Sequence, residues 1–266
     1  MNATTTELVE QVTRHRLYTH PIWEHWAESP PPPDVVGALF HQIQCFCAST
    51  RPGGALPEGL RALGLGHQAE LLEEIVASEA GHGPELATMA AHIINQAAGR
   101  SVFGDLYDQA VIEAGLKKAS DRILGTLPAY DPITGLTVQA RRAITVFERR
   151  KLTDPASVMR NLGTALALEI ISNQELIPGE KLALVDSGHY RVSLDAPEMH
   201  YLKEHWGECG AEHQHEANVV TAVETALSRD NEQLIHRGVV DFLEALVRLW
   251  DVLDAALLQS GYAEAA

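Results

Sequence analysis

Residues 200–220 read HYLKEHWGECGAEHQHEANVV, a stretch unusually rich in histidine and glutamate. If the stretch forms one helix, with about 100° per residue, four ionisable side chains share a stripe about 80° wide. The four are His205, Glu208, Glu212 and His215. Apolar residues stand at both ends of this stripe, so it is predicted to face the protein interior. Two imidazoles and two carboxylates on a buried face require bound cations or paired charges.

The rest of the chain has the pattern of an all-α protein. Apolar residues recur at helical spacing, and breaks such as SPPPPD at 29–34 and IPGE at 177–180 separate the helical stretches. Strand signals are almost absent, and neither a repeat nor a linker divides the chain. We therefore predict a single all-α domain over residues 1–266, a bundle of about seven to nine helices, with Asp154 starting one of them.

The charge and cysteine content of the chain indicate which partners and which cellular compartment to expect. The 266 residues include 20 basic and 36 acidic side chains, giving a formal net charge of −16. This excess of negative charge argues against nucleic acid and anionic membranes as partners. Three cysteines do not make a disulfide framework, and Cys45 and Cys47 are interpreted as buried thiols. With neither a signal segment nor an apolar run of membrane-spanning length, the chain is expected to be soluble and cytoplasmic.

Glu169 is another ionisable residue among apolar ones, within LGTALALEIISNQ at 162–174. A lone carboxylate on such a face costs several kcal/mol unless it is paired or bound to a metal. The sequence leaves two alternatives open. Glu169 is either a metal ligand or the partner of an arginine, the candidates being Arg141, Arg142 and Arg149.

Glu79 and His82 have the spacing Glu-x-x-His, which places two side chains on one helix face. Glu212 and His215 repeat this unit. Carboxylate-bridged di-iron sites in helical bundles use the unit twice, together with single glutamates, because carboxylates bridge two cations and imidazoles complete each ion's ligand set. His92, in the apolar stretch AAHIIN at 90–95, would by itself more often be a satisfied core histidine, and only the family resemblance described below makes it an alternative to His82.

The sequence thus predicts an interior metal site with eight candidate ligands: Glu79, His82, His92, Glu169, His205, Glu208, Glu212 and His215. The competing interpretation is that HQHE, at 213–216, is a surface tract that binds metal without function. His213 lies about 100° off the stripe and is expected to point away from the interior.

Four motifs occur in the order seen in the haem-oxygenase-like di-iron oxygenases: THPIWEHW at 19–26, LLEEIVASEAGHGPE at 71–85, ALALE at 165–169 and YLKEHWGECGAEHQHE at 201–216. The chain resembles this family, which includes the chlamydial CADD-like proteins and shares its fold with thiaminase TenA and the quinone synthase PqqC. The resemblance covers roughly residues 15–225. It implies a haem-oxygenase-like bundle that holds two Fe(II) ions and uses dioxygen as co-substrate.

The resemblance also implies a function and a ligand set. Family members oxidise small amines or amino-acid-derived substrates, by N-oxygenation or oxidative carbon–carbon cleavage, in specialised metabolism. Their last helix carries His-x3-Asp-x2-His. Here His205, Cys209 and Glu212 match it in one register, and Glu208, Glu212 and His215 match it in another, each with changed residues.

The expected partner is a small-molecule substrate. An external electron donor and a second copy of the chain, in a homodimer, are left open. The alternative functions are a metal-free enzyme like TenA or PqqC and a degenerate metal-binding protein without catalysis.

Overall fold

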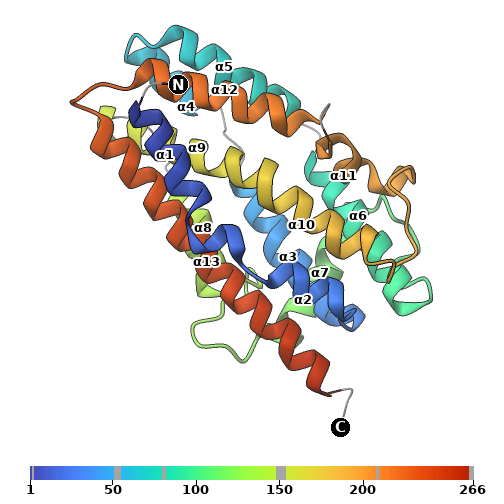
Figure 1. The fold of residues 1–266 in the computed structure, drawn as a ribbon. Coiled ribbons are helices and arrows are strands. Elements are labelled where there is room, and N and C mark those ends of the chain that lie inside the picture. The colour runs from blue at the N-terminus through green and yellow to red at the C-terminus, as the bar shows by residue number, and fades with distance from the viewer. Residues whose placement is uncertain (2, 51–54, 80–81, 148–153, 208–209, 264–266) are drawn as a thin grey trace.

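The computed structural model describes residues 1–266 except 2, 51–54, 80–81, 148–153, 208–209 and 264–266 (Figure 1). In chain order its α-helices are α1 (Ala3–Thr13), α2 (Ile22–Glu28), α3 (Pro33–Thr50), α4 (Ala55–Ala62), α5 (Gly66–Ser78), α6 (His82–Ala98), α7 (Gln109–Leu124), α8 (Val138–Phe147), α9 (Pro155–Ile171), α10 (Ile177–Lys181), α11 (His200–His205), α12 (Ala211–Ala226) and α13 (Glu232–Ala263). The described residues contain no strand, apart from an isolated bridge between Asp131 and Leu136. The all-α prediction is confirmed, although the helical segments are more numerous than expected.

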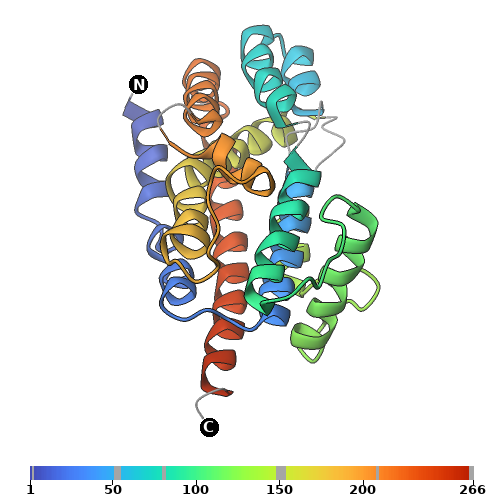
Figure 2. The same ribbon diagram turned by 90° about the vertical axis from the view of Figure 1, so that its right-hand side faces the viewer.

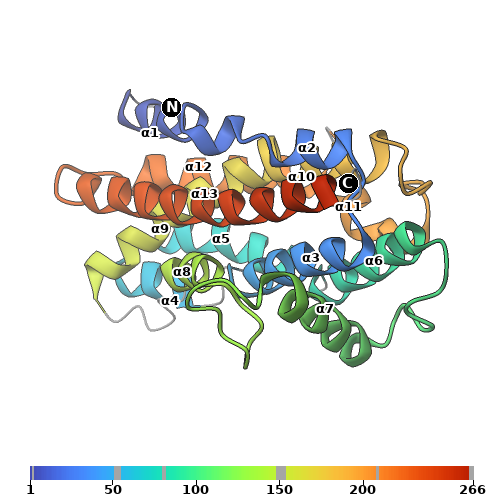
Figure 3. The same ribbon diagram turned by 90° about the horizontal axis from the view of Figure 1, so that it is seen from below.

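The long helix α13 organises the bundle. It packs along α9 and also contacts α8, α2 and α1. Figure 3 shows it between α1 and α2 on one side and α8, α3 and α7 on the other, and Figure 2 shows it running lengthwise through the molecule. Helices α5 and α12 lie side by side at one end of the bundle (Figure 1). Buried apolar side chains from these helices form one connected core cluster.

Helices α9 and α13 approach closely because each has a glycine at their crossing. A Cβ added to Gly163 would lie 2.0 Å from the carbonyl oxygen of Ile235, and one added to Gly238 would lie 1.9 Å from that of Arg160. Real side-chain atoms do not approach backbone oxygens so closely. The crossing therefore depends on the absence of side chains at both positions.

Residues 155–186 form a continuous helical run, so the predicted break at 177–180 is wrong. A π-helical segment, η3 (Ser172–Leu176), precedes α10, and a second one, η4 (Leu182–Asp186), follows it. Proline lacks an N–H and its ring crowds the carbonyl four residues earlier. The wider π turn, in which Ile177 N–H bonds to Ser172 O, relieves this crowding at Pro178 and lets the helix continue.

Asp154 begins α9 as predicted, with its carboxylate accepting a hydrogen bond from Ser157 N at 2.9 Å. The helix that follows is apolar on nearly all sides and runs through the core. None of the helices in the described part of the chain combines the length and apolar character needed to cross a membrane.

Candidate metal centre

Five ionisable side chains from four helical elements converge inside one end of the bundle. Glu79 caps the C-terminus of α5, Glu169 lies near the end of α9, and His205 is the last residue of α11. Glu212 and His215 are in the first two turns of α12. All except Glu79, which is partly buried, are almost inaccessible to solvent. The prediction that His205, Glu212 and His215 point inward is confirmed.

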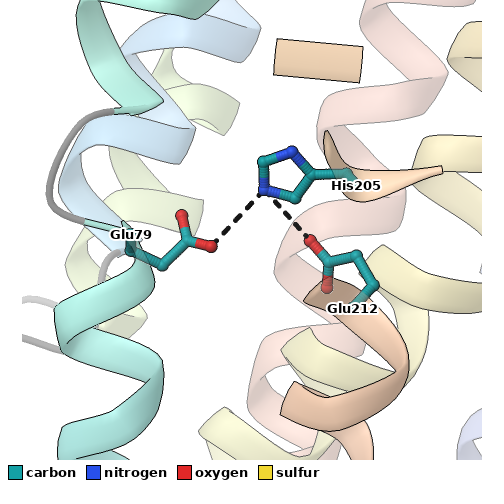
Figure 4. Close-up of side chains that lie close together, drawn as sticks. All are labelled: Glu79, His205 and Glu212. Carbon is teal, nitrogen blue, oxygen red and sulfur yellow. Dashed lines mark hydrogen bonds and ion pairs between the residues drawn. The ribbon is translucent and has the colours of Figure 1, made fainter. Parts of the chain in front are cut away.

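The first group of converging atoms consists of Glu79, His205 and Glu212, and we call it the His205 group (Figure 4). His205 Nε2 lies 3.4 Å from Glu79 Oε1 and 3.6 Å from Glu212 Oε1. The three side chains come from separate elements and point toward one another. One ligand atom from each lies within 4.8 Å of the others, a spacing that can hold a metal ion.

The second group consists of Glu169, Glu212 and His215, and we call it the His215 group. His215 Nδ1 lies 3.7 Å from Glu169 Oε2 and 3.8 Å from Glu212 Oε2. Glu212 is therefore shared: its Oε1 faces His205 and its Oε2 faces His215. Glu79 Oε1 is also 3.6 Å from His215 Nδ1. Such sharing of carboxylates is the arrangement that bridges two neighbouring cations.

Hydrogen bonds on the far side of each imidazole assign its tautomer. His205 Nδ1 lies 2.6 Å from the backbone oxygen of Tyr201, an acceptor, so Nδ1 carries the proton. On the other histidine, Nε2 lies 2.6 Å from Ser78 Oγ. Because Ser78 already donates to Ile75 O at 2.9 Å, its oxygen accepts from His215 Nε2. In the neutral rings, His205 Nε2 and His215 Nδ1 then direct lone pairs at the carboxylates.

This orientation needs either a proton or a cation between each ring nitrogen and the carboxylate that it faces. Lone pairs on nitrogen repel carboxylate oxygens, whereas a metal ion between them attracts both. Metal-ligating histidines characteristically donate their second N–H to a carbonyl or another acceptor, which fixes the ring and increases its basicity. Tyr201 O and Ser78 Oγ are acceptors of this kind. The geometry around both rings therefore has the form of two supported ligands.

Electrostatics also favour cation binding. Burial, reinforced by the charge of Glu79, raises the pKa of Glu169 above its ordinary value. Burial raises the pKa of Glu212 strongly, and the charges of Glu169 and Glu79 raise it further. A group of carboxyls with raised pKa values holds protons until cations replace them, so metal binding here releases protons and weakens in acid.

A break between two helices brings His205 toward α12, which corrects the prediction of one helix with one stripe. Helix α11 ends at His205, and α12 begins at Ala211. Gly207 has φ of 92°, a left-handed conformation that favours glycine. A Cβ added to Gly210 would lie 2.5 Å from the backbone oxygen of His205. The two glycines allow a tight connection that returns His205 to the start of α12.

Three predicted ligands are not brought into these groups by the described structure. Glu208 lies outside the described residues. His82 is the first residue of α6, with its side chain outside the described part, and because α5 ends at Ser78, the prediction that Glu79 and His82 share one helix face is wrong. His92 is half-buried ten residues into α6, about 15 Å along it at 1.5 Å per residue, and belongs to neither group.

The structure also bears on the surface-tract interpretation of HQHE and on the arginine partners considered for Glu169. His213 is exposed, with Nδ1 3.2 Å from Asn173 Nδ2, so it points away as predicted. Arg141 donates to Ala129 O, and Arg142 is exposed. Glu169 faces His215, and among the described residues no arginine or lysine forms an ion pair with it. Arg149 lies outside the described residues.

A small cavity adjoins the two groups. It has a volume of about 50 Å³, and Glu79, Glu169, His205 and Glu212 form its polar wall. Phe46, Leu168 and Leu176 contribute apolar surface, and Cys47, Ser172 and Tyr201 complete the lining. No lysine or arginine occurs among the described residues of this lining. Cys45 and Cys47 are not in disulfide bonds and are only partly buried, and burial raises the pKa of Cys45 to about 11.

Sequence reasoning missed the supporting residues Ser78 and Tyr201. Ser78 precedes Glu79 in the chain, and Tyr201 precedes His205 by one helical turn. Ser78 contacts its histidine through a hydroxyl, which every serine has, and Tyr201 through its backbone oxygen, which every residue has. A residue pattern has no signal for such a role, because it depends on where two separate helices meet. The carboxylates Glu175 and Glu180 were missed as well, since 177–180 was interpreted as a break.

Three carboxylates and two imidazoles form a donor set suited to first-row divalent metals such as iron or manganese rather than to soft copper(I) or thiolate-bound zinc. Among the comparisons with known proteins, no family model matches the chain, and neither a curated protein nor a solved structure matches it. Function must therefore be inferred from the site itself.

We expect Ser78→Ala to weaken metal binding about 10- to 100-fold, because His215 loses the acceptor that orients its ring. Isothermal titration of apoprotein with Fe(II) or Mn(II) without oxygen measures the affinity. Thr221→Ala is the matched control, since this exposed hydroxyl on α12 bonds only within its own helix, to Ala217 O. Equal affinities for the two variants would contradict the role assigned to Ser78.

Proposed function

We propose that the chain is a non-haem di-iron oxygenase that uses dioxygen to oxidise a small amine or amino-acid-derived substrate. The observation that carries the proposal is Glu212, whose two oxygens face two different histidines. A single-ion site does not need this arrangement, whereas a carboxylate that bridges two ions does. The Glu-x-x-His pair on α12 and the single glutamates from α5 and α9 match part of the ligand pattern of such bundle sites, which use two of these pairs; here His205 of α11 provides the second imidazole.

In this proposal, five side chains would bind the two ions and two further groups would orient the histidines. His205 and Glu79 would hold one ion, His215 and Glu169 the other, and Glu212 both. Tyr201 O and Ser78 Oγ keep the two rings oriented. Bound in the reduced state, two irons supply the electrons and the open coordination positions that activate dioxygen. An external electron donor would return them to that state after turnover.

The cavity fits the small co-substrate. A volume of about 50 Å³ exceeds the roughly 10–15 Å³ of cavity that one water needs and accommodates a molecule of the size of dioxygen. Its apolar wall of Phe46, Leu168 and Leu176 favours an uncharged guest and limits water at the site. No lysine or arginine among the described lining residues is placed to pair with an anionic substrate.

The test is an anaerobic titration of apoprotein with Fe(II), followed by exposure to oxygen. We expect about two equivalents of iron to bind, and oxygen to be consumed with a transient visible absorption band. Binding of one equivalent, or of none, would contradict the two-ion centre. Binding of two equivalents with no uptake of oxygen would instead support a metal-binding protein without catalysis.

A second candidate function is supported by Cys47, which lines the same cavity as the carboxylates. A thiol beside carboxyls can act as a nucleophile in a metal-free enzyme. The two candidates differ in their response to substitution and chelation. If the centre is a di-iron site, a chelator abolishes activity and Cys47→Ser leaves two irons bound. If the enzyme is metal-free, a chelator has no effect and Cys47→Ser abolishes activity.

A further inference from the structure

A second set of buried carboxyls lies in the helical run that leads away from the metal centre. Glu175 is in η3 and Glu180 is in α10, and both are buried. Glu175 accepts a hydrogen bond from Trp23 Nε1 at 2.8 Å, which ties η3 to α2. Glu180 is only 1% exposed, and among the described residues neither of its oxygens has a hydrogen-bond partner. An ionised carboxylate in this position would be unsolvated, so Glu180 is stable as the neutral acid.

The backbone around Glu180 is held firmly. Two π-helical segments flank α10, and such segments occur frequently at functional sites in helices. A Cβ added to Gly179 would lie 2.2 Å from the Trp23 ring, so α10 rests directly on α2. On the opposite side α10 contacts α11. Glu180 therefore has a defined position rather than a choice of solvent-directed rotamers.

The titratable groups around Glu180 connect it to the metal centre. On η3 the facing group is Glu175, whose charge acts on Glu180. On α11 and α12 they are Tyr201 and Glu212, and the charge of Glu180 raises the pKa of each. On η4, Asp186 is paired with Lys181, and on α2 the packing residue is the uncharged Trp23. Leu176, four residues before Glu180 in the same helical run, lines the cavity of the metal centre, and α10 contacts α11, which carries the lining residue Tyr201.

We propose that Glu180 is a proton-storing residue of the metal centre, which enters each cycle as a neutral acid and supplies its proton to an anionic oxygen group in the cavity. This inference rests on the proposed function. In the step, the O–H bond of the Glu180 carboxyl breaks and an O–H bond forms at the acceptor, with no transfer of electrons. Glu180 is left as a carboxylate, whose burial makes it a strong base, and it regains a proton from solvent before the next cycle.

Stability against pH provides a readout that needs no metal. Burial, with a smaller effect from Glu175, raises the pKa of Glu180 to about 8 from an ordinary value of 4.5. The folded protein therefore binds this proton more tightly than the unfolded chain. The resulting stabilisation is complete below about pH 4.5 and is lost as the pH rises through about 8. Glu180→Gln, which mimics the neutral acid, removes this loss.

The experiment compares wild type, Glu180→Gln and Glu175→Gln. In apoprotein, we expect infrared spectra to lose one protonated-carboxyl stretch in Glu180→Gln, and we expect this variant to melt at a higher temperature than wild type at about pH 9 but not at about pH 5. In iron-loaded protein, we expect Glu180→Gln to bind two irons but to consume oxygen about 100-fold more slowly, with a larger solvent deuterium isotope effect.

Glu175→Gln is the matched control, because it removes another buried carboxyl from the same helical run but one tied to Trp23, and its oxygen consumption should stay within about 3-fold of wild type. An unchanged infrared spectrum in Glu180→Gln overturns the proton store. Iron-loaded Glu180→Gln that consumes oxygen at the wild-type rate overturns its role while leaving the di-iron function intact. Wild type that binds no iron overturns the proposed function itself, and the proton-supply role with it.

Discussion

Glu212→Ala is expected to release both metal ions and to lower iron-dependent oxygen consumption at least about 100-fold. The reason is that Glu212 belongs to both ligand groups, with one oxygen toward each histidine. Losing a residue that only supports a ligand costs about 10- to 100-fold in metal affinity, so losing a shared ligand should cost more. Elemental analysis after gel filtration, together with an oxygen electrode, measures both quantities.

His213→Ala is the matched control on the same helix, one residue away. His213 is exposed and belongs to neither group, so the iron content and oxygen consumption of this variant should equal those of wild type. The apoprotein of Glu212→Ala should remain folded, because removing a buried carboxyl whose pKa is strongly raised relieves desolvation at neutral pH. If His213→Ala loses iron and Glu212→Ala keeps it, the surface-tract interpretation of HQHE is correct and the interior centre is wrong.

Gly163→Ala is expected to destabilise the protein by about 3 kcal/mol, the largest effect on folding that we anticipate from a single methyl group. Its new Cβ would lie 2.0 Å from Ile235 O, so α9 and α13 would have to separate along their contact. Because α9 also carries Glu169, the shift should loosen the His215 group. Urea unfolding measures the change in stability, and a metal titration measures the effect on the site.

Gly66→Ala is the control, because a Cβ at this exposed position in α5 would meet nothing within 4 Å. Alanine is the better helix former, so this variant should be unchanged or more stable by up to about 1 kcal/mol. Gly238→Ala, on the other side of the crossing, should behave like Gly163→Ala. If both crossing variants unfold at the same urea concentration as wild type, the crossing of α9 and α13 does not depend on the absence of side chains at these two glycines.

The helical nature of the chain and the inward direction of its ionisable residues could be predicted from local pattern. Helical periodicity reports which residues share a face, and a carboxylate such as Glu169 among leucines and isoleucines is costly wherever that face is buried. Asp154 identified a helix start because capping is local chemistry between an Asp side chain and the next turn. These inferences needed no knowledge of where other helices lie.

Two inferences from periodicity were wrong because a backbone break interrupted the period. The stripe at 205–215 assumed one helix, yet Gly207 adopts a left-handed conformation and separates α11 from α12. The Glu79 and His82 pair assumed one helix, yet α5 ends at Ser78. The opposite error was made at Pro178 and Gly179, which were interpreted as a helix break. The helix continues there because a π turn accommodates the proline and because Gly179, without a side chain, packs directly against the Trp23 ring.

The sequence by itself determined an all-helical chain with carboxylates and imidazoles on inward faces, because periodicity and the cost of burying charge are properties of each segment. Only the tertiary structure decided that Glu212 is shared between two histidines, that Ser78 and Tyr201 orient the rings, and that Glu180 is buried with no hydrogen-bond partner among the described residues. These relations join α5, α9, α10, α11 and α12. They depend on helix crossings and backbone breaks, which arise from packing between distant segments and leave no periodic trace in any one of them.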